Sequence, residues 1–250
     1  LAAGEDERAD EERAHREGKT PRGCKCETNP AGLQAADATA ERAWGGTDDA
    51  SGIRGWHDSR RDRAVTDRFE PGSVMKVFTI AAALASGTVK PTEQIFCEHG
   101  TYQLGNVTIH DTHENDMLTV TQVLAKSSNI GALKIGLGLG EPGLYGAFRK
   151  FGFGEPTGLP IPGEASGVLR PKGRPWFEVE TANASFGQGI SVTTVQLATA
   201  MSAIANGGKV MEPILVRKVA DAKGNVIKEW APRVRREAIP AATAKMVSEM

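Results

Sequence analysis

Apolar residues are distributed very unevenly along this 250-residue chain, which limits how much of it can fold. Residues 1–60 hold three residues of the set Val, Ile, Leu, Met and Phe, whereas residues 61–250 hold 54. Ordering a backbone costs roughly 1–2 kcal/mol per residue, and so little apolar material cannot offset that cost. We therefore interpret residues 1–60 as a segment that does not fold independently, and expect residues 61–250 to form one domain.

Charge divides the chain at the same place. Residues 1–60 carry 9 basic and 13 acidic side chains (net −4), and residues 61–250 carry 21 and 18 (net +3). Neither part has the strong basic field of a nucleic-acid-binding protein, so we expect no nucleic-acid partner. The apolar run of residues 77–89, between Lys76 and Lys90, is shorter than the roughly 18 residues that a membrane span needs.

The order of the predicted elements indicates an α+β or layered α/β domain. No alternation of strands and helices is visible, and the strand patterns are those of antiparallel pairs. We expect helices over residues 73–86 (ending at Gly87), 119–126, 130–139 (broken at Gly140), 144–151, 193–206 and from Pro240 onward. We expect short extended pieces over 95–109, a loop over 152–175 and a hairpin formed by 214–219 and 226–230.

Ser73 and Lys76 form the first pair with chemical potential. A serine in the first turn of a helix lies where free N–H groups favour negative charge, and a lysine three residues later shares its face. Burial of that lysine would lower its pKa and make it a general base for the serine. The competing interpretation is an ordinary Ser cap followed by a surface lysine, and the spacing alone does not decide between them.

Ser127-Ser128-Asn129 lies between two predicted helices and is the second candidate. A hydroxyl and an amide on one short loop can relay a proton and hydrogen-bond a substrate. Ser and Asn are also common in turns that link helices, so the segment alone favours a structural interpretation. The two motifs in this order make the catalytic interpretation stronger.

Several segments together resemble the transpeptidase domain of class B penicillin-binding proteins, from about residue 61 to residue 250. They are residues 69–76 (FEPGSVMK), 125–131 (AKSSNIG) and 185–193 (SFGQGISVT). The last segment, with Gln196-Leu197 and residues 205–208 (ANGG), is most similar to the division-specific (septal) branch. The resemblance implies an antiparallel sheet flanked by helices, with a helical subdomain.

The resemblance also implies a serine acyltransferase that cross-links peptidoglycan. Ser73 would be the nucleophile, Lys76 its base, Ser127 the proton relay and Asn129 the group that binds the substrate amide. The enzyme would need neither a cofactor nor a metal. Its partners would be stem peptides ending in D-Ala-D-Ala, β-lactam antibiotics, and division and glycan-polymerising proteins. The domain would lie on the outer (periplasmic) side of an inner-membrane anchor that this chain does not contain.

Two other functions use the same motifs. A serine β-lactamase or D,D-carboxypeptidase would let water resolve the acyl-enzyme, although no carboxylate near the second motif is suited to activating water. A non-catalytic β-lactam sensor would keep Ser73 and Lys76 for acylation without turnover. The lifetime of the penicilloyl adduct, with D-Ala release in the presence of an acceptor amine, separates the three.

The N-terminal segment departs from the family. Residues 1–60 lack the pair of strands that the family has before its nucleophile helix, and the resemblance begins near Asp62. We therefore interpret residues 1–60 as disordered or translated from a shifted reading frame. Resequencing that finds one clean frame through this junction would remove the second explanation.

The family's third motif, K-[ST]-G, does not occur between Asn129 and Met250. In the family it supplies a positive group for the substrate carboxylate and an oxyanion donor, and one such donor lowers the barrier by about 2.7–4 kcal/mol. We therefore expect this 250-residue chain by itself to be catalytically inactive or nearly so. Measurable acylation of the isolated chain by a labelled penicillin would contradict this expectation.

Overall fold

The computed structural model describes residues 62–169 and 174–250, and residues Asp62–Met250 belong to one compact unit. The predictions for residues 1–60 lie outside the described residues. The helices are α4 (Arg63–Thr66), α5 (Met75–Ser86), α6 (Val120–Ala125), α7 (Asn129–Phe151), α8 (Glu178–Ser185), α9 (Thr194–Ala205) and α10 (Ala241–Ser248), with the 3-10 turns η1 (Gly72–Val74) and η2 (Glu98–Gly100).

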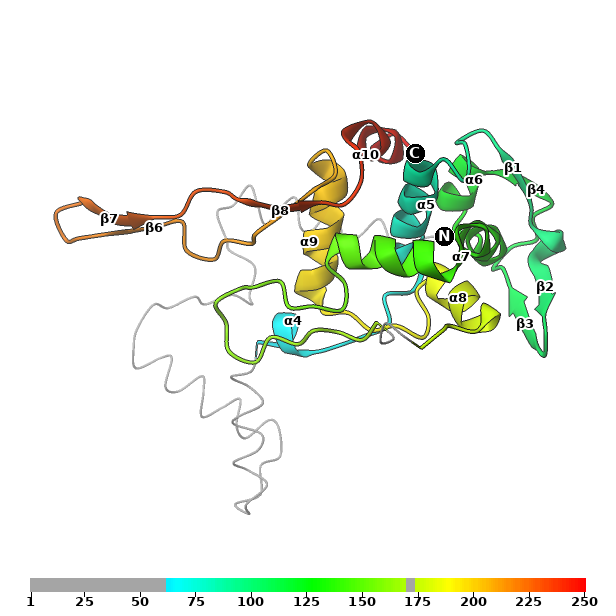
Figure 1. Cartoon of the computed structure of the whole chain (residues 1–250), viewed down its shortest axis with the longest axis horizontal. Helices are drawn as coiled ribbons and strands as arrows, with labels where there is room; N and C mark the ends of the chain where they lie inside the picture. Colours follow the sequence, from blue (N-terminus) through cyan, green and yellow to red (C-terminus); the bar gives the residue numbers. More distant parts are fainter. Residues whose placement is uncertain (1–61, 170–173) are drawn as a thin grey trace, which may run out of the picture. The chain divides into compact units, whose positions relative to one another are not determined.

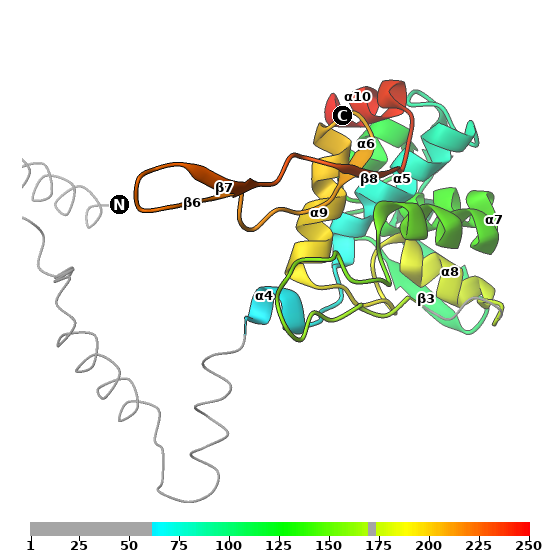
Figure 2. The same cartoon turned by 60° about the vertical axis from the view of Figure 1, so that its left-hand side comes forward.

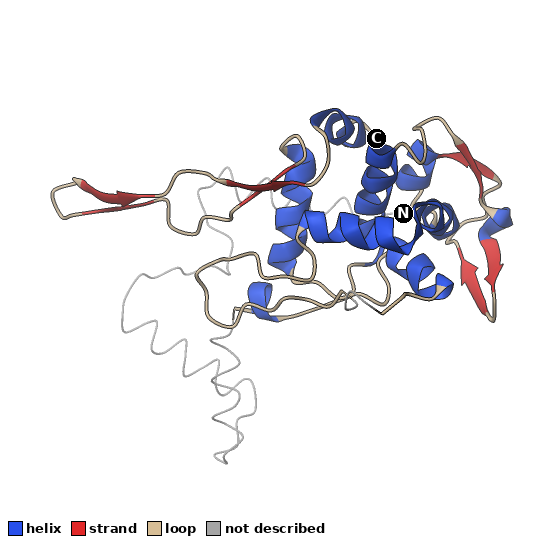
Figure 3. Cartoon of the chain, viewed as in Figure 1, coloured by secondary structure: helices blue, strands red, loops and turns tan. Residues whose placement is uncertain are grey.

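The strands of the described residues pair only in twos, and every pair is antiparallel (Figure 3). The pairs are β1 (Gln94–Phe96) with β4 (Met117–Thr119), β2 (Thr101–Leu104) with β3 (Val107–His110), β5 (Lys209–Met211) with β8 (Val234–Glu237), and β6 (Lys218–Ala220) with β7 (Val226–Glu229). The predicted mixture of helices with antiparallel strands is confirmed.

Helix α5 is the central element of the unit. Eight of its residues are buried, and α6, α7, α8 and α10 pack against it (Figures 1 and 2). Phe78 packs edge-on against Phe151 and Phe153 in one apolar cluster, and Ile80 contributes to a second cluster. The predicted helix over residues 73–86 is therefore confirmed as a buried one, although its first turn is the 3-10 turn η1. Because α5 belongs to both clusters, its N-terminal turn is held rigidly.

The predicted helix boundaries agree well with the observed ones. Gly87 ends α5 in the left-handed conformation (φ 73°), which glycine adopts without the penalty of a Cβ. Thr119 and Thr193 form capping boxes with Gln122 and Gln196 at the starts of α6 and α9. The expected break at Gly140 is present as a kink inside α7.

A single buried glutamine orders part of the predicted loop over residues 152–175. The Gln196 side chain is 2% exposed, and its amide nitrogen donates to the backbone oxygens of Glu155 and Ser166 at 2.7 Å each. Its amide oxygen accepts from the backbone N–H of Thr193 at 2.9 Å. The described residues of the loop form no helix. Val168 forms an isolated antiparallel β-bridge with Ser191.

Several elements were not predicted, among them α4, β4, α8, β5 and β8. Helix α8 has few large apolar residues and buries alanine, serine and threonine instead, so the apolar periodicity that signals a helix is weak. Strands β5 and β8 are short and irregularly paired, and Val210 is the fully buried residue of β5. Segments this short carry too few residues for a recognisable alternation pattern.

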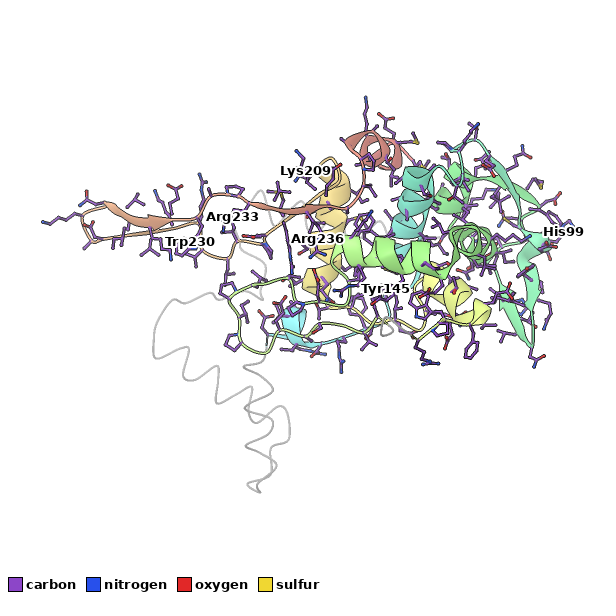
Figure 4. All side chains as sticks on the ribbon, in the orientation of Figure 1. His99, Tyr145, Lys209, Trp230, Arg233 and Arg236 are labelled. Atoms are coloured by element: carbon purple, nitrogen blue, oxygen red, sulfur yellow. The ribbon has the colours of Figure 1, made fainter. Side chains whose placement is uncertain are left out.

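The predicted hairpin is present, but it is shorter than expected. Its strands are β6 and β7, and the carboxylate of Asp221 accepts backbone N–H groups of Lys223 and Asn225 in the turn. Residues 214–216 are outside any strand, because the chain opposite them runs through Pro232, which has no N–H to donate. The hairpin extends away from the helices, with Trp230 and Arg233 near its base (Figure 4).

None of the helices in the described ranges combines the length and the apolar character needed to cross a bilayer.

The contact between α7 and α8 generates a stability prediction. A Cβ added at Gly136 would lie 1.8 Å from Oγ and 2.7 Å from Cβ of Ser185, so Gly136→Ala forces the two helices apart. We expect the free energy of unfolding in urea to fall by about 1–3 kcal/mol. Gly146→Ala in the same helix is the matched control, because its Cβ would meet no atom within 4 Å. It should be neutral or stabilise by up to about 1 kcal/mol. Equal effects of the two substitutions would contradict the close packing.

Candidate active site

The N-terminal turn of α5 brings Ser73 and Lys76 together. Ser73 lies in η1 and is exposed, whereas Lys76 in the first turn of α5 is 1% exposed. The amine Nζ of Lys76 donates to Oγ of Ser73 at 3.1 Å. The interpretation of Lys76 as an ordinary surface lysine is therefore wrong, since its ammonium is enclosed and its partner is the neighbouring hydroxyl.

Ser127 approaches the same amine from the loop between α6 and α7. Nζ of Lys76 donates to Oγ of Ser127 at 3.0 Å and also to the backbone oxygen of Ser127. Ser127 has a positive φ of 57°, a conformation that few non-glycine residues adopt and that is enriched at functional sites. The three oxygens match the three N–H bonds of an ammonium, and loss of the proton that faces either hydroxyl would leave a lone pair facing that hydroxyl.

Burial changes the acid–base behaviour of this amine. Desolvation lowers the pKa of Lys76 from 10.5 to about 8, and the charge of Asp111 opposes that shift without cancelling it. At pH 7 Lys76 would then be neutral in about a tenth of the molecules, whereas a free lysine is neutral in only about a few in ten thousand. A neutral amine between two hydroxyls can accept a proton from either of them.

Asn129 occupies a different place. Its side-chain amide donates to the backbone oxygen of His110 at 2.8 Å, at the end of β3. Within the described residues the Asn129 side chain has no hydrogen bond to Lys76, Ser73 or Ser127, so the structure joins three of the four predicted residues directly. Asn129 follows Ser127 by two residues and is the first residue of α7.

Sequence reasoning did not find Asp111. Its carboxylate accepts hydrogen bonds from Oγ of Ser128 and from the backbone N–H groups of Asn129 and Ile130. Ser128 in turn caps α7 by accepting from the N–H of Gly131 at 2.9 Å. A single aspartate far from the motif in sequence gives no local signal, because only the fold brings it to this helix end.

The segment around Gly187 lies against the turn that carries Ser73. A Cβ at Gly187 would lie 2.1 Å from the backbone oxygen of Gly72, so only glycine fits there. The N–H of Gly72 donates to the oxygen of Gly187 at 3.1 Å, and the N–H of Gly189 donates to the carboxylate of Glu70 at 3.0 Å. The third resembling segment therefore positions the turn that carries Ser73.

Comparison with known proteins shows the family of this chain. Residues 32–250 match the family described as "Penicillin binding protein transpeptidase domain". The chain belongs to the penicillin-binding protein transpeptidase family. The resemblance derived from the motifs is thus confirmed, and the family match also includes residues 32–60, for which we expected none. The boundary near residue 61 stays a prediction.

Relatives in the family carry transpeptidase names. The chain is 43% identical over 157 residues to "Probable peptidoglycan D,D-transpeptidase PbpC" of Pseudomonas aeruginosa, covering 63% of this chain and 28% of that protein. It is 36% identical over 162 residues to "Peptidoglycan D,D-transpeptidase FtsI" of Escherichia coli, covering 65% and 27%. It therefore spans little more than a quarter of these relatives.

A solved transpeptidase has the same fold. The structure described as "Apo structure of TP domain from Burkholderia pseudomallei penicillin-binding protein 3" superposes with a TM-score of 0.68 at 35% identity. The superposition covers 76% of this chain and 55% of that one. The predicted penicillin-binding fold is confirmed.

The buried amine predicts a pH dependence of stability. The pKa of Lys76 is about 8 in the folded chain, against 10.5 for an ordinary lysine such as that of the unfolded chain. Between pH 8 and pH 10.5 Lys76 is therefore protonated in the unfolded chain and largely neutral in the folded chain. The free energy of unfolding consequently rises with pH across this range. Relative to Lys76→Met, the free energy of unfolding of the unmodified chain should rise on the order of 3 kcal/mol from pH 8 to pH 10.5.

Urea unfolding at a series of pH values measures this difference. Lys150→Met, at an exposed position of α7, controls for the loss of one positive charge. A difference between the unmodified chain and Lys76→Met that stays constant with pH would contradict the burial of the amine.

Proposed function

We propose that this chain is part of a D,D-transpeptidase of peptidoglycan, called the parent protein below. The observation that carries the proposal is the amine of Lys76 within hydrogen-bond distance of both Ser73 and Ser127. A nucleophile beside its base, with a second hydroxyl on that base, is the arrangement that acyl transfer requires.

In the first half-reaction, Oγ of Ser73 attacks the carbonyl carbon of the penultimate D-Ala of a stem peptide. Its proton passes to the neutral amine of Lys76, 3.1 Å away. The bond from that carbonyl to the terminal D-Ala nitrogen breaks, and the nitrogen receives a proton from Ser127, which Lys76 reprotonates. Terminal D-Ala leaves, and the stem peptide remains as an ester on Ser73.

In the second half-reaction, an amine of a neighbouring stem peptide attacks the ester. The amine's proton travels in the reverse direction through Ser127 and Lys76 to Oγ of Ser73. The products are a cross-linking amide and the free serine, so protons and bonds balance over the cycle. The same groups serve as base and then acid, which suits a lysine whose pKa lies near neutrality.

The remaining assignments follow from family membership. Asn129 binds the amide of the stem peptide, and β-lactams acylate Ser73 by the same first step. The relatives' names support a role in wall synthesis, and the FtsI relative supports the division branch. We propose that the protein works at the cell envelope, anchored in the inner membrane with this domain on the outer side, together with division and glycan-polymerising proteins.

The assignment of the nucleophile can be tested in the parent protein. Ser73→Ala should abolish covalent labelling by a fluorescent penicillin, since it removes the hydroxyl that the proposal assigns as the nucleophile beside Nζ of Lys76. Circular dichroism should show an unchanged fold, because Ser73 is exposed. The readout is a labelled band on a denaturing gel.

The matched control is Ser86→Ala at the other end of α5, where Oγ donates to the backbone oxygen of Ala83. Labelling of this variant should equal that of the unmodified protein. Persistent labelling of Ser73→Ala would place the nucleophile elsewhere.

A further inference from the structure

Asp111 follows β3 and lies against the start of α7. The first N–H groups of a helix have no partner within the helix and need an acceptor from outside. The carboxylate of Asp111 is such an acceptor, because it accepts hydrogen bonds from the N–H groups of both Asn129 and Ile130. It also accepts from the hydroxyl of Ser128, which is 1% exposed.

The loop that carries Ser127 is therefore fixed on both sides. On the side of α6, the N–H of Ser127 donates to the oxygen of Leu124, and that of Ser128 donates to the oxygen of Val123. On the side of α7 the fixing group is Asp111. Ser127 lies between these attachments with a positive φ, a conformation that persists only where its surroundings enforce it.

Asp111 is also the charged group that acts on the amine of Lys76. The other polar groups at this amine are Ser73 on its own helix and Ser127 on the loop, which are neutral hydroxyls. Cys97, beside Ser128, has its pKa raised by burial and is a neutral thiol near pH 7. Asp111 raises the pKa of Lys76 against the larger effect of burial.

We infer that Asp111 is a positioning residue for acyl transfer, which fixes the loop that holds Ser127 against Lys76. The inference rests on the proposed function. It assigns to Asp111 no contact with the substrate and no proton transfer of its own. Its effect on the reaction passes through Ser127 and Lys76.

Asp111→Asn in the parent protein removes the negative charge of the side chain but keeps its size and one acceptor oxygen. The asparagine oxygen can still accept from the N–H groups of Asn129 and Ile130, but its NH₂ group cannot accept the hydroxyl proton of Ser128. The second-order rate of acylation by a fluorescent penicillin is measured against pH. We expect the plateau rate to fall roughly ten-fold or more, because small misplacements of reacting groups cost up to about 10²-fold.

The acid limb of the same pH profile is the range in which the acylation rate rises as Lys76 loses its proton. In Asp111→Asn this limb should move to lower pH. Without the negative charge the pKa of Lys76 falls further, so the neutral base persists at lower pH. A purely structural role of Asp111 would lower the amount of active protein without moving this limb. Asp111→Glu keeps the charge and displaces the carboxylate, so its plateau should fall while its acid limb stays closer to that of the unmodified protein.

Asp116→Asn is the matched control. It removes the same charge five residues away, from an exposed side chain with no hydrogen bond or ion pair to any described residue. Its plateau and acid limb should equal those of the unmodified protein.

The possible results have distinct meanings. If Asp111→Asn behaves like Asp116→Asn while the unmodified protein is labelled at Ser73, the inference is overturned and the proposed function stands. If the unmodified protein is not labelled at Ser73, both fail. Should Asp111→Asn not fold, the plateau of Asp111→Glu decides, and an unchanged plateau overturns the inference.

Discussion

The contact on which the candidate site depends is a lysine amine taken out of water and placed between two serine hydroxyls. Lys76 is 1% exposed, and its Nζ lies 3.1 Å from Oγ of Ser73 and 3.0 Å from Oγ of Ser127. Burial disfavours the ammonium and lowers the pKa to about 8, while the hydrogen bonds keep the amine satisfied in either protonation state. A surface lysine with the same spacing from a serine would stay charged and could not serve as a base near pH 7.

Much of the fold serves to hold that contact. Helix α5 joins both apolar clusters, so the helix that carries Lys76 cannot shift without disturbing the core. Gly187 lies directly on the backbone of Gly72, one residue before Ser73. The loop of Ser127 is fixed from outside by Asp111, at the end of β3. Segments distant in sequence thus hold the two motifs that meet at one amine, which explains why the motifs occur as separate short runs.

The sequence predicted those features whose cause is local. The ends of α5 and α9, the kink at Gly140 and the capping box at Thr119 follow from residues within one turn of the feature. The pairing of Ser73 with Lys76 follows from helix geometry. Features that arise only from packing were missed, among them Asp111 at a distant helix end and α8, which buries small residues. The contact between Lys76 and Ser127 became an expectation only through the resemblance, since 51 residues separate them.

The protonation of Lys76 decides whether its amine can act as a base, and it can be measured in the chain itself. Carbon-13 labelling of lysine side chains, with Lys76→Met to assign the signal, gives a direct NMR titration of the carbon next to Nζ. We predict a midpoint near pH 8 for the Lys76 signal. A midpoint close to the ordinary value of 10.5 would contradict a buried amine poised to act as the base for Ser73.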